Sequence, residues 1–231
     1  ALVYGAVRAI YEDNNNNIWI GQFPGSVSFH DRSTSALAVY KKIPDRADSM
    51  SDNNVQRVAE DQQGNIWMAV GDGINVLNRE TNRVKRYTIA QQNYPARGSL
   101  SIYIDKSNTP WVGTWAEGYY RYDVNSDKFI AMPFNASLAG AQEKTSPVLN
   151  DATVWGFCET KRGEFWITTH YAGINRYDPA TGLFTKYRND ATDTSLANNI
   201  AWGCLEDSKG RLWIGTANGL SRLDPGQETF K

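Results

Sequence analysis

One tryptophan context, repeated along the chain, constrains the fold more than any other feature. Six residues before each such tryptophan stands an aspartate or a threonine, and three residues before it a glycine or an asparagine. The five tryptophans are Trp19, Trp67, Trp111, Trp166 and Trp213, separated by 48, 44, 55 and 47 residues. Repeats of this length are supersecondary units that bury their apolar faces only by stacking on one another. The sequence therefore predicts a repeat architecture.

Each repeat is predicted to contain four short strands. The position three residues before the tryptophan holds only Asn16, Gly64, Asn108, Gly163 and Gly210. Glycine and asparagine best tolerate the positive φ of a tight hairpin, so a strand, a turn and the tryptophan strand follow one another. Two further apolar stretches complete each unit, and helical periodicity is absent.

Four-stranded repeats of 40 to 50 residues are the blades of β-propellers. We predict an all-β chain, a β-propeller built of five four-stranded antiparallel blades in one domain over residues 1–231. The blades are predicted at 5–44, 53–90, 98–134, 152–189 and 199–231. Two alternatives stay open for closure: an excised part of a larger propeller, or a compact five-bladed ring.

Composition excludes several classes of protein. The 25 acidic residues nearly balance the 24 basic ones, for a net charge of −1, so no basic surface is expected for a nucleic-acid partner. The longest apolar run, Ile66 to Val70, is far too short to span a bilayer. No charged start followed by an apolar core opens the chain, so we expect no secretion signal within it.

The segment from Ile200 to Asp224 resembles the two-component regulator propeller repeat, I-x-E-D-x-x-G-x-x-W-I-G-T-x-x-G-L-x-R-x-D. The resemblance covers almost the whole chain, with departures at Ile104, Pro110 and Thr160. It implies a non-enzymatic sensor in the periplasmic or extracellular part of a membrane-anchored bacterial receptor. The implied partner is a downstream signalling domain of the same receptor, and a homodimer is compatible with this arrangement.

Three tryptophans stand outside the repeat, and we expect them on one rim of the blades. Trp115 falls in a loop between second and third strands, whereas Trp155 and Trp202 each lie eleven residues before a repeat tryptophan. Arg8 and Gln56 occupy the equivalent place in other units. The links between blades that reach this rim vary in length, and function tends to lie on variable loops of a regular scaffold.

These residues predict a site for a small polar ligand or an oligosaccharide, because aromatic rings cover C–H surfaces while polar neighbours bind hydroxyls. The predicted ligand-binding residues are Trp115, Trp155, Trp202, His170, Tyr171, Glu117, Arg8 and Gln56, with Arg97, Asn150, Asp151 and Asn198 nearby. The alternative for Trp155 and Trp202 is packing between blades. A protein-binding propeller, or a virginiamycin B lyase-like enzyme built around His170, are the alternative functions.

The remaining reactive groups receive structural assignments. The glutamates Glu12, Glu60, Glu159 and Glu206 recur at one repeat position and are expected to support turns, as are the repeat aspartates. No catalytic residue, cofactor or metal site is predicted, since no HExxH, CxxC, GxSxG or nucleotide-binding loop occurs. His30 is assigned a structural role. Cys158 and Cys204 lie one register apart in neighbouring strands, so we expect their side chains on opposite sheet faces and no disulfide.

Overall fold

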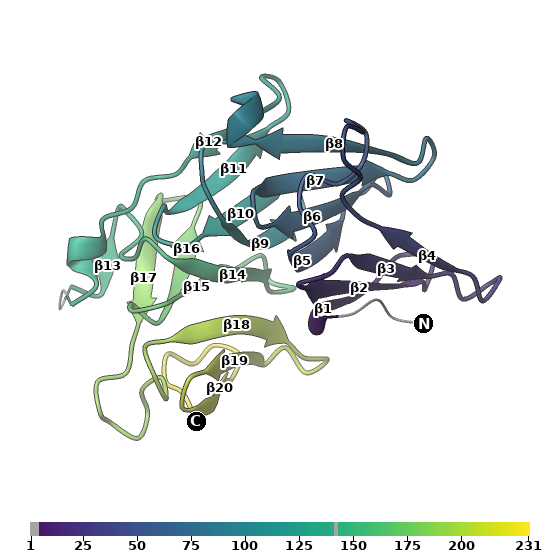
Figure 1. Cartoon of the computed structure of the whole chain (residues 1–231). Helices are drawn as coiled ribbons and strands as arrows, with labels where there is room; N and C mark the ends of the chain where they lie inside the picture. Colours follow the sequence, from purple (N-terminus) through teal and green to yellow (C-terminus); the bar gives the residue numbers. More distant parts are fainter. Residues whose placement is uncertain (1–4, 141–142) are drawn as a thin grey trace. The chain divides into compact units, whose positions relative to one another are not determined.

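The computed structural model describes residues 5–140 and 143–231. Antiparallel strands make up the ordered elements, apart from two single 3-10 turns, η1 (Ile89–Gln91) and η2 (Ala136–Leu138) (Figure 1). The strands form five successive sheets, so the predicted all-β propeller of five blades is confirmed. The chain divides into two compact units. The first runs up to Val112 and includes Tyr120–Ile130, and the second comprises Gly113–Tyr119 and the described residues from Ala131 onward.

The first three sheets each contain four strands. The first has the order β1 (Ala6–Glu12), β2 (Ile18–Phe23), β3 (Val27–His30), β4 (Leu37–Tyr40). The second has the order β5 (Val55–Glu60), β6 (Ile66–Val70), β7 (Gly73–Asn78), β8 (Arg83–Thr88). The third consists of β9 (Ser99–Ile104), β10 (Pro110–Thr114), β11 (Tyr119–Asp123) and β12 (Lys128–Ala131).

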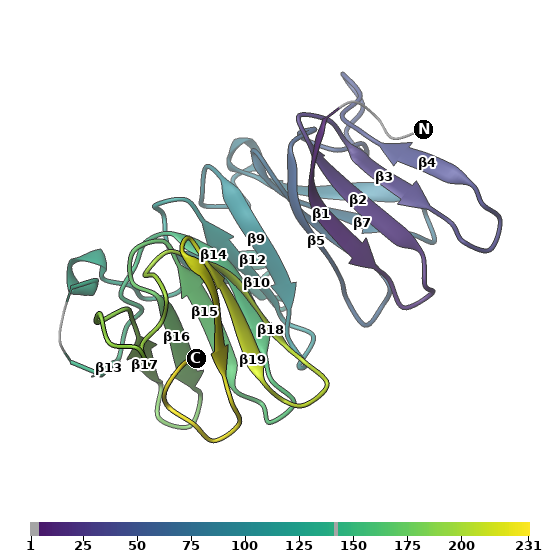
Figure 2. The ribbon, with the colours of Figure 1, turned by 90° about the horizontal axis from the view of Figure 1, so that it is seen from below.

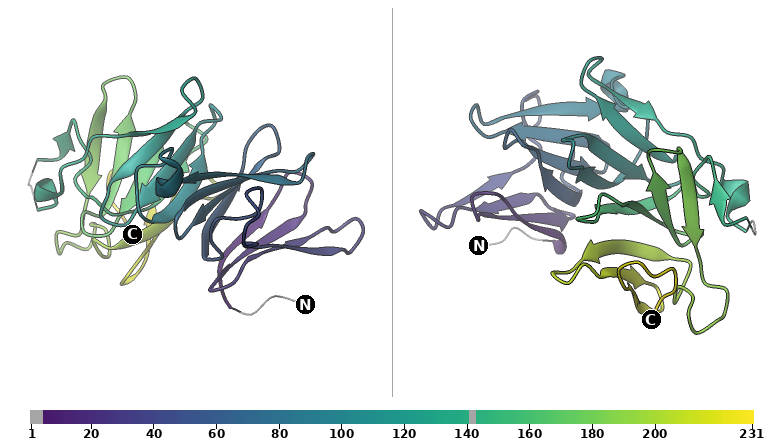
Figure 3. Two further views of the ribbon diagram at one scale, coloured as in Figure 1. Left: turned by 45° about the horizontal axis from the view of Figure 1, so that its top comes forward. Right: turned by 180° about the vertical axis from the view of Figure 1, so that it is seen from behind.

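The last two sheets depart slightly from four strands. The fourth contains β14 (Val154–Glu159), β15 (Phe165–Thr169), β16 (Ile174–Asp178) and β17 (Leu183–Tyr187), and the short β13 (Thr145–Ser146) pairs with the outer edge of β17 (Figure 3). The fifth contains β18 (Ala201–Glu206), β19 (Leu212–Thr216) and β20 (Gly219–Leu223). Phe230 bridges to Leu223 where the predicted fourth strand begins.

The predicted turns form as expected, with positive φ at the residue three before each repeat tryptophan. The values are 60° at Asn16, 77° at Gly64, 62° at Asn108, 84° at Gly163 and 73° at Gly210. The aspartate of the turn accepts bonds from its backbone amides, as predicted. It also accepts the indole N–H, at 2.8 Å for Asp13 with Trp19 and for Asp207 with Trp213, which the sequence had not indicated.

Neighbouring blades stack with opposite faces in contact. In the first unit, Trp19 of one sheet shares a core with Ile66 and Met68 of the next. In the second unit, Trp166 shares a core with Leu212 and Ile214. The tryptophan face of one blade therefore packs on the other face of the following blade. The repeat tryptophans are buried, except Trp213, which is half-buried.

This stacking overturns the prediction for the cysteines. Cys158 pairs in register with Trp166, and Cys204 pairs with Ile214, so their side chains do leave their own sheets on opposite faces. Those two faces meet across the second unit's blades, where β14 and β18 run side by side (Figure 2). Cys158 and Cys204 form a disulfide with a Cα–Cα distance of 5.9 Å. The prediction was wrong because opposite faces are the ones that touch between consecutive sheets.

Candidate functional site

Trp155 and Trp202 owe their position to a β-bulge at the start of the innermost strand. In β14 the pairing passes from Val154 with Thr169 to Gly156 with Thr168, which leaves Trp155 as the extra residue. The pairing of β18 leaves out Trp202 in the same way. A bulge residue is unpaired in the ladder and its side chain is redirected, a feature often found beside functional sites.

The first unit repeats the bulge with polar residues. The pairing of β1 leaves out Arg8, and that of β5 leaves out Gln56. The guanidinium of Arg57 donates to the carbonyl oxygens of Arg8 at 3.0 Å and of Gln56 at 3.1 Å. The structure thus brings these two predicted residues together in the first unit. The tryptophans belong to the second unit.

The three extra tryptophans form one continuous aromatic cluster in the second unit. The ring centroids of Trp155 and Trp202 are 4.8 Å apart, with the rings inclined at 63°. Trp115 lies 5.7 Å from Trp155 at 73°. Both pairs are edge-to-face contacts, the arrangement that aromatic quadrupoles favour. Residues from the β10–β11 loop, β14 and β18 therefore share one surface.

His170 is the centre of this cluster. Its ring lies 5.2 Å from Trp115, 5.8 Å from Trp155, 6.2 Å from Trp202 and 4.3 Å from Tyr171. The indole N–H of Trp155 donates to Nδ1 of His170 at 3.0 Å. Because Nδ1 accepts this bond, Nε2 is the ring nitrogen that can donate to a ligand. The cluster therefore combines apolar ring faces with a hydrogen-bond donor.

Buried polar groups hold the loops of the cluster in place. The carboxylate of Asp151 accepts the backbone N–H of Thr153 at 2.9 Å and that of Tyr171 at 2.5 Å. The hydroxyl of Thr153 in turn accepts the N–H of Ala116 at 3.0 Å. Asp151 and Thr153 are buried, so they position the β10–β11 and β15–β16 loops from beneath.

The cluster remains accessible. Trp115 is 51% exposed, Trp202 41% and Tyr171 61%, while Trp155 and His170 are half-buried. The contact between Trp155 and Trp202 joins two blades, as packing between blades would require, but the exposed fraction of Trp202 leaves ring surface free. These aromatic faces can cover the C–H surfaces of a polar ligand.

Other predicted neighbours have different places. Glu117 is half-buried in the β10–β11 loop, and Arg97 is exposed in the first unit. Asn198 is half-buried, and its side chain accepts the N–H of Ile200 at 2.8 Å, before β18. Asn150 lies in the link before β14 and is fully buried, so its side chain is covered, like that of Asp151. Its place in the repeat is that of the buried Ser51.

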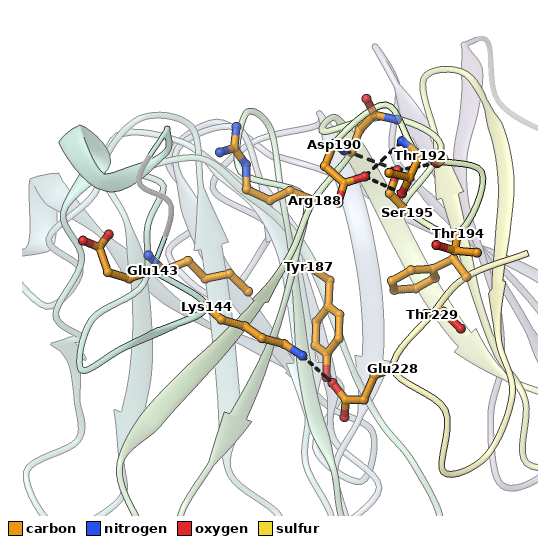
Figure 4. A pocket seen from close by; sticks show the side chains of 13 residues that line it. Glu143, Lys144, Tyr187, Arg188, Asp190, Thr192, Thr194, Ser195, Glu228 and Thr229 are labelled. Carbon is orange, nitrogen blue, oxygen red and sulfur yellow. Dashed lines mark hydrogen bonds and ion pairs between the residues drawn. The ribbon is translucent and has the colours of Figure 1, made fainter.

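A pocket of about 610 Å³ also lies in the second unit, and no sequence pattern predicted it. Its walls come from segments around Lys144, Tyr187 and Glu228, far apart in the chain. In Figure 4 Lys144 and Tyr187 converge on Glu228, at 3.1 Å and 2.6 Å. Burial and this bond raise the pKa of Tyr187. Burial opposes ionisation of Glu228, yet bonds from Tyr187 and Lys144 lower its pKa. Its carboxylate is thus already engaged.

Neither a membrane-spanning helix nor a cluster of metal-ligating side chains occurs among the described residues. The helical elements between residues 5 and 231 include none long and apolar enough to cross a bilayer. No group of three or more histidine, cysteine, aspartate or glutamate side chains is placed to hold a metal ion in the described part of the chain.

Solved structures share this fold. The extracellular domain of BT4673 from B. thetaiotaomicron, named a one component system, matches with a TM-score of 0.71 at 16% identity over 94% of this chain and 27% of that one. The extracellular domain of BT3049, named a hybrid two component system of the same organism, matches with a TM-score of 0.61 at 18% identity, over 96% and 34%. This chain therefore spans about a third or less of their length.

A virginiamycin B lyase from Staphylococcus aureus matches with a TM-score of 0.70 at 14% identity, over 97% of this chain and 69% of that one. At such identities these likenesses establish the fold alone. No curated protein sequence matches the chain.

The family model described as two component regulator propeller matches residues 1–23, 49–72 and 195–218. These stretches contain the bulge positions of Arg8, Gln56 and Trp202 and three of the five repeat turns. The family model and the blade architecture agree with the tryptophan repeat, and in these three stretches the chain is similar to repeats of the two-component regulator propeller family.

Proposed function

We propose that this propeller is a non-enzymatic ligand-sensing module of a bacterial signalling receptor, located in its periplasmic or extracellular part. Its ligand is a carbohydrate or a similar polar molecule that docks on the aromatic cluster of Trp115, Trp155, Trp202, His170 and Tyr171. Binding acts on the receptor by favouring one arrangement of the propeller over another, because a ligand shifts an equilibrium by its differential affinity. The signal passes to a downstream domain of the same receptor.

One observation carries this proposal. Tryptophans that depart from the repeat gather in one partly exposed cluster, although the blades themselves do not need them. Exposed aromatic clusters with polar groups are typical of recognition surfaces. The fold shared with extracellular domains of signalling systems supports the receptor setting.

A thermal-shift screen against neutral and acidic oligosaccharides, followed by calorimetric titration, tests the proposal. Trp202→Ala should weaken binding at least about fivefold, roughly 1 kcal/mol, with little loss of stability. Leu205→Ala is the matched control, because Leu205 is 66% exposed on the same strand. Its affinity should equal that of the unmodified protein. Equal affinities of all three proteins would contradict the assignment of the site.

The repeat tryptophan Trp67 provides the opposite control. Trp67 is 6% exposed, and its removal should lower the free energy of unfolding by about 3 to 5 kcal/mol. Ligand affinity of the folded fraction should change little. Chemical denaturation and titration of both variants separate the core tryptophans from those of the cluster.

The shared fold with virginiamycin B lyase supports an enzyme as the second candidate. His170 would be its starting point. Incubation of the protein with a streptogramin B antibiotic, with and without magnesium, tests this function. Turnover that disappears in His170→Ala would favour the lyase, whereas no turnover in either protein favours the sensor.

A protein-binding propeller is the remaining function. If millimolar glycans leave the melting temperature unchanged while a purified receptor domain forms a complex with the propeller, this function replaces ligand sensing.

A further inference from the structure

The two strands that carry the paired tryptophans are also joined covalently. Trp155 lies three residues before Cys158 on β14, and Trp202 lies two residues before Cys204 on β18. At about 3.3 Å per strand residue, each tryptophan is within roughly 10 Å of the bridge along its strand. The disulfide is thus a fixed link close to the ring pair.

Between the rings and the bridge, the two strands approach each other without side chains. A Cβ on Gly156 would lie 3.7 Å from the carbonyl oxygen of Trp202 and 3.8 Å from the Cα of Gly203. Stacked sheets normally keep their spacing through interdigitated side chains. Gly156 supplies none toward β18, and a Cβ on Gly203 would meet nothing within 4 Å, so the spacing of β14 and β18 at this level depends on other links.

The first two blades show how the same level is held without cysteines. Counted from the bulge, Ala9 and Arg57 occupy the places of Gly156 and Gly203. The Arg57 side chain donates to the carbonyl oxygen of Arg8 on the neighbouring blade at 3.0 Å. A side-chain hydrogen bond thus joins these bulges, whereas the fourth and fifth blades have glycines here and a disulfide one or two residues further along the strands.

We propose that the Cys158–Cys204 disulfide is a positioning element of the aromatic site, which sets the spacing of Trp155 and Trp202. A dithiol such as dithiothreitol transfers two electrons and two protons to the bridge, gives two thiols and is itself oxidised to a cyclic disulfide. The strands β14 and β18 then separate at the glycines, and the ring pair loosens. The effect on ligand affinity rests on the proposed function, but the effect on ring geometry does not.

Circular dichroism measures the ring geometry directly, because indoles 4.8 Å apart couple and give an exciton couplet. The difference between the spectra of the unmodified protein and Trp202→Phe gives the contribution of the Trp155–Trp202 pair to the couplet. We expect the same part to disappear after reduction with dithiothreitol and in the double variant Cys158→Ala/Cys204→Ala. A full couplet in the reduced protein, with two free thiols by titration, would overturn the proposal.

A control separates positioning from general stability, and it covers the case in which the double variant fails to fold. Ile174→Val trims a fully buried residue of the same core cluster without touching the bridge. Reduced protein and this variant are compared at temperatures where both remain folded. The couplet should persist in Ile174→Val and disappear on reduction. Equal loss in both would show that the bridge only stabilises the fold.

Titration with cellohexaose, a neutral glycan with stacking faces, adds the binding readout. Reduction should raise the dissociation constant at least about fivefold. An unchanged dissociation constant would contradict the positioning role. If the oxidised protein does not bind cellohexaose, the proposed function fails for this glycan, and the couplet alone decides on the role of the bridge.

Discussion

At the scale of single residues, Arg79 illustrates how a few side chains hold a blade pair together. Its guanidinium donates to Asp13 at 2.6 Å, to Glu60, and to the carbonyl oxygen of Gly64 at 2.7 Å. The side chains of Asp13 and Glu60 are 0% and 1% exposed. Two buried carboxylates without a cation would leave charge uncompensated. Arg79 therefore links the turns of the first and second blades.

Replacement of Arg79 by methionine should lower the free energy of unfolding by about 3 kcal/mol or more, since both carboxylates lose their cation. Arg32→Met is the matched control, because its ion pair with Glu12 is more than half exposed on both sides. That variant should lose at most about 1 kcal/mol. Urea denaturation measures both. Similar losses in the two variants would contradict this role of Arg79.

Thr160 is the one repeat position where threonine replaces aspartate, and it leaves a buried indole N–H unsatisfied. Trp166 is 1% exposed, and its Nε1 has no hydrogen-bond partner among the described residues. Thr160→Asp should supply the acceptor that Asp13 gives Trp19 and raise stability by about 1 kcal/mol. Thr160→Val cannot accept a bond and should not stabilise. A higher melting temperature for Thr160→Val than for Thr160→Asp would contradict this prediction.

At the scale of elements, the second, third and fifth blades each support the turn of the blade before them. Glu60 accepts the N–H of Asn14 at 2.8 Å, and Glu206 accepts that of Lys161 at 2.8 Å. Where Ile104 replaces the glutamate, Asn108 accepts the N–H of Gln62 at 2.8 Å instead. The recurrence of these glutamates predicted turn support, but a count along one chain could not reveal that the supported turn belongs to the preceding blade.

The turn of the fifth blade should make stability depend on acidity. Bonds from Trp213, Arg211 and the turn amides lower the pKa of Asp207 from its ordinary value of 3.8. As the pH falls, the unfolded chain therefore takes up this proton before the folded one. The contribution of Asp207 is complete above the ordinary value and is lost as the pH falls below it. The free energy of unfolding should fall more steeply between about pH 5 and pH 3 than in Asp207→Asn. Parallel curves would contradict this account.

At the scale of the whole molecule, the repeat made it possible to predict the blades, the turns and the common rim of the extra tryptophans. Each of these features lies a fixed number of residues from Trp19 or its equivalent in another repeat. The disulfide escaped prediction because face alternation was counted within one sheet. The bulge at Trp155 was not predicted either, because in the sequence Trp155 looks like any other residue of a strand. The pocket beside Glu228 draws on distant segments, which no repeat connects.

The disulfide should stabilise the molecule beyond its effect on the rings. It joins residues 46 apart in sequence, for which the entropy of a closed loop corresponds to about 4 kcal/mol. Reduction should therefore lower the melting temperature clearly in calorimetry. Dithiothreitol added to the double variant Cys158→Ala/Cys204→Ala serves as the control and should change nothing. Equal melting temperatures of the reduced and the oxidised protein would contradict this prediction.

The bulge at the start of the innermost strands has a consequence for how such domains diversify. The same repeat position, the bulge, is occupied by Arg8, Gln56, Trp155 and Trp202 in four different blades. None of these residues takes part in the pairing of its sheet. An arginine, an amide and two indoles are all accepted there by the same backbone. If the proposed function holds, exchanges at these bulge positions would change what the surface recognises without altering the strand pairing of the blades.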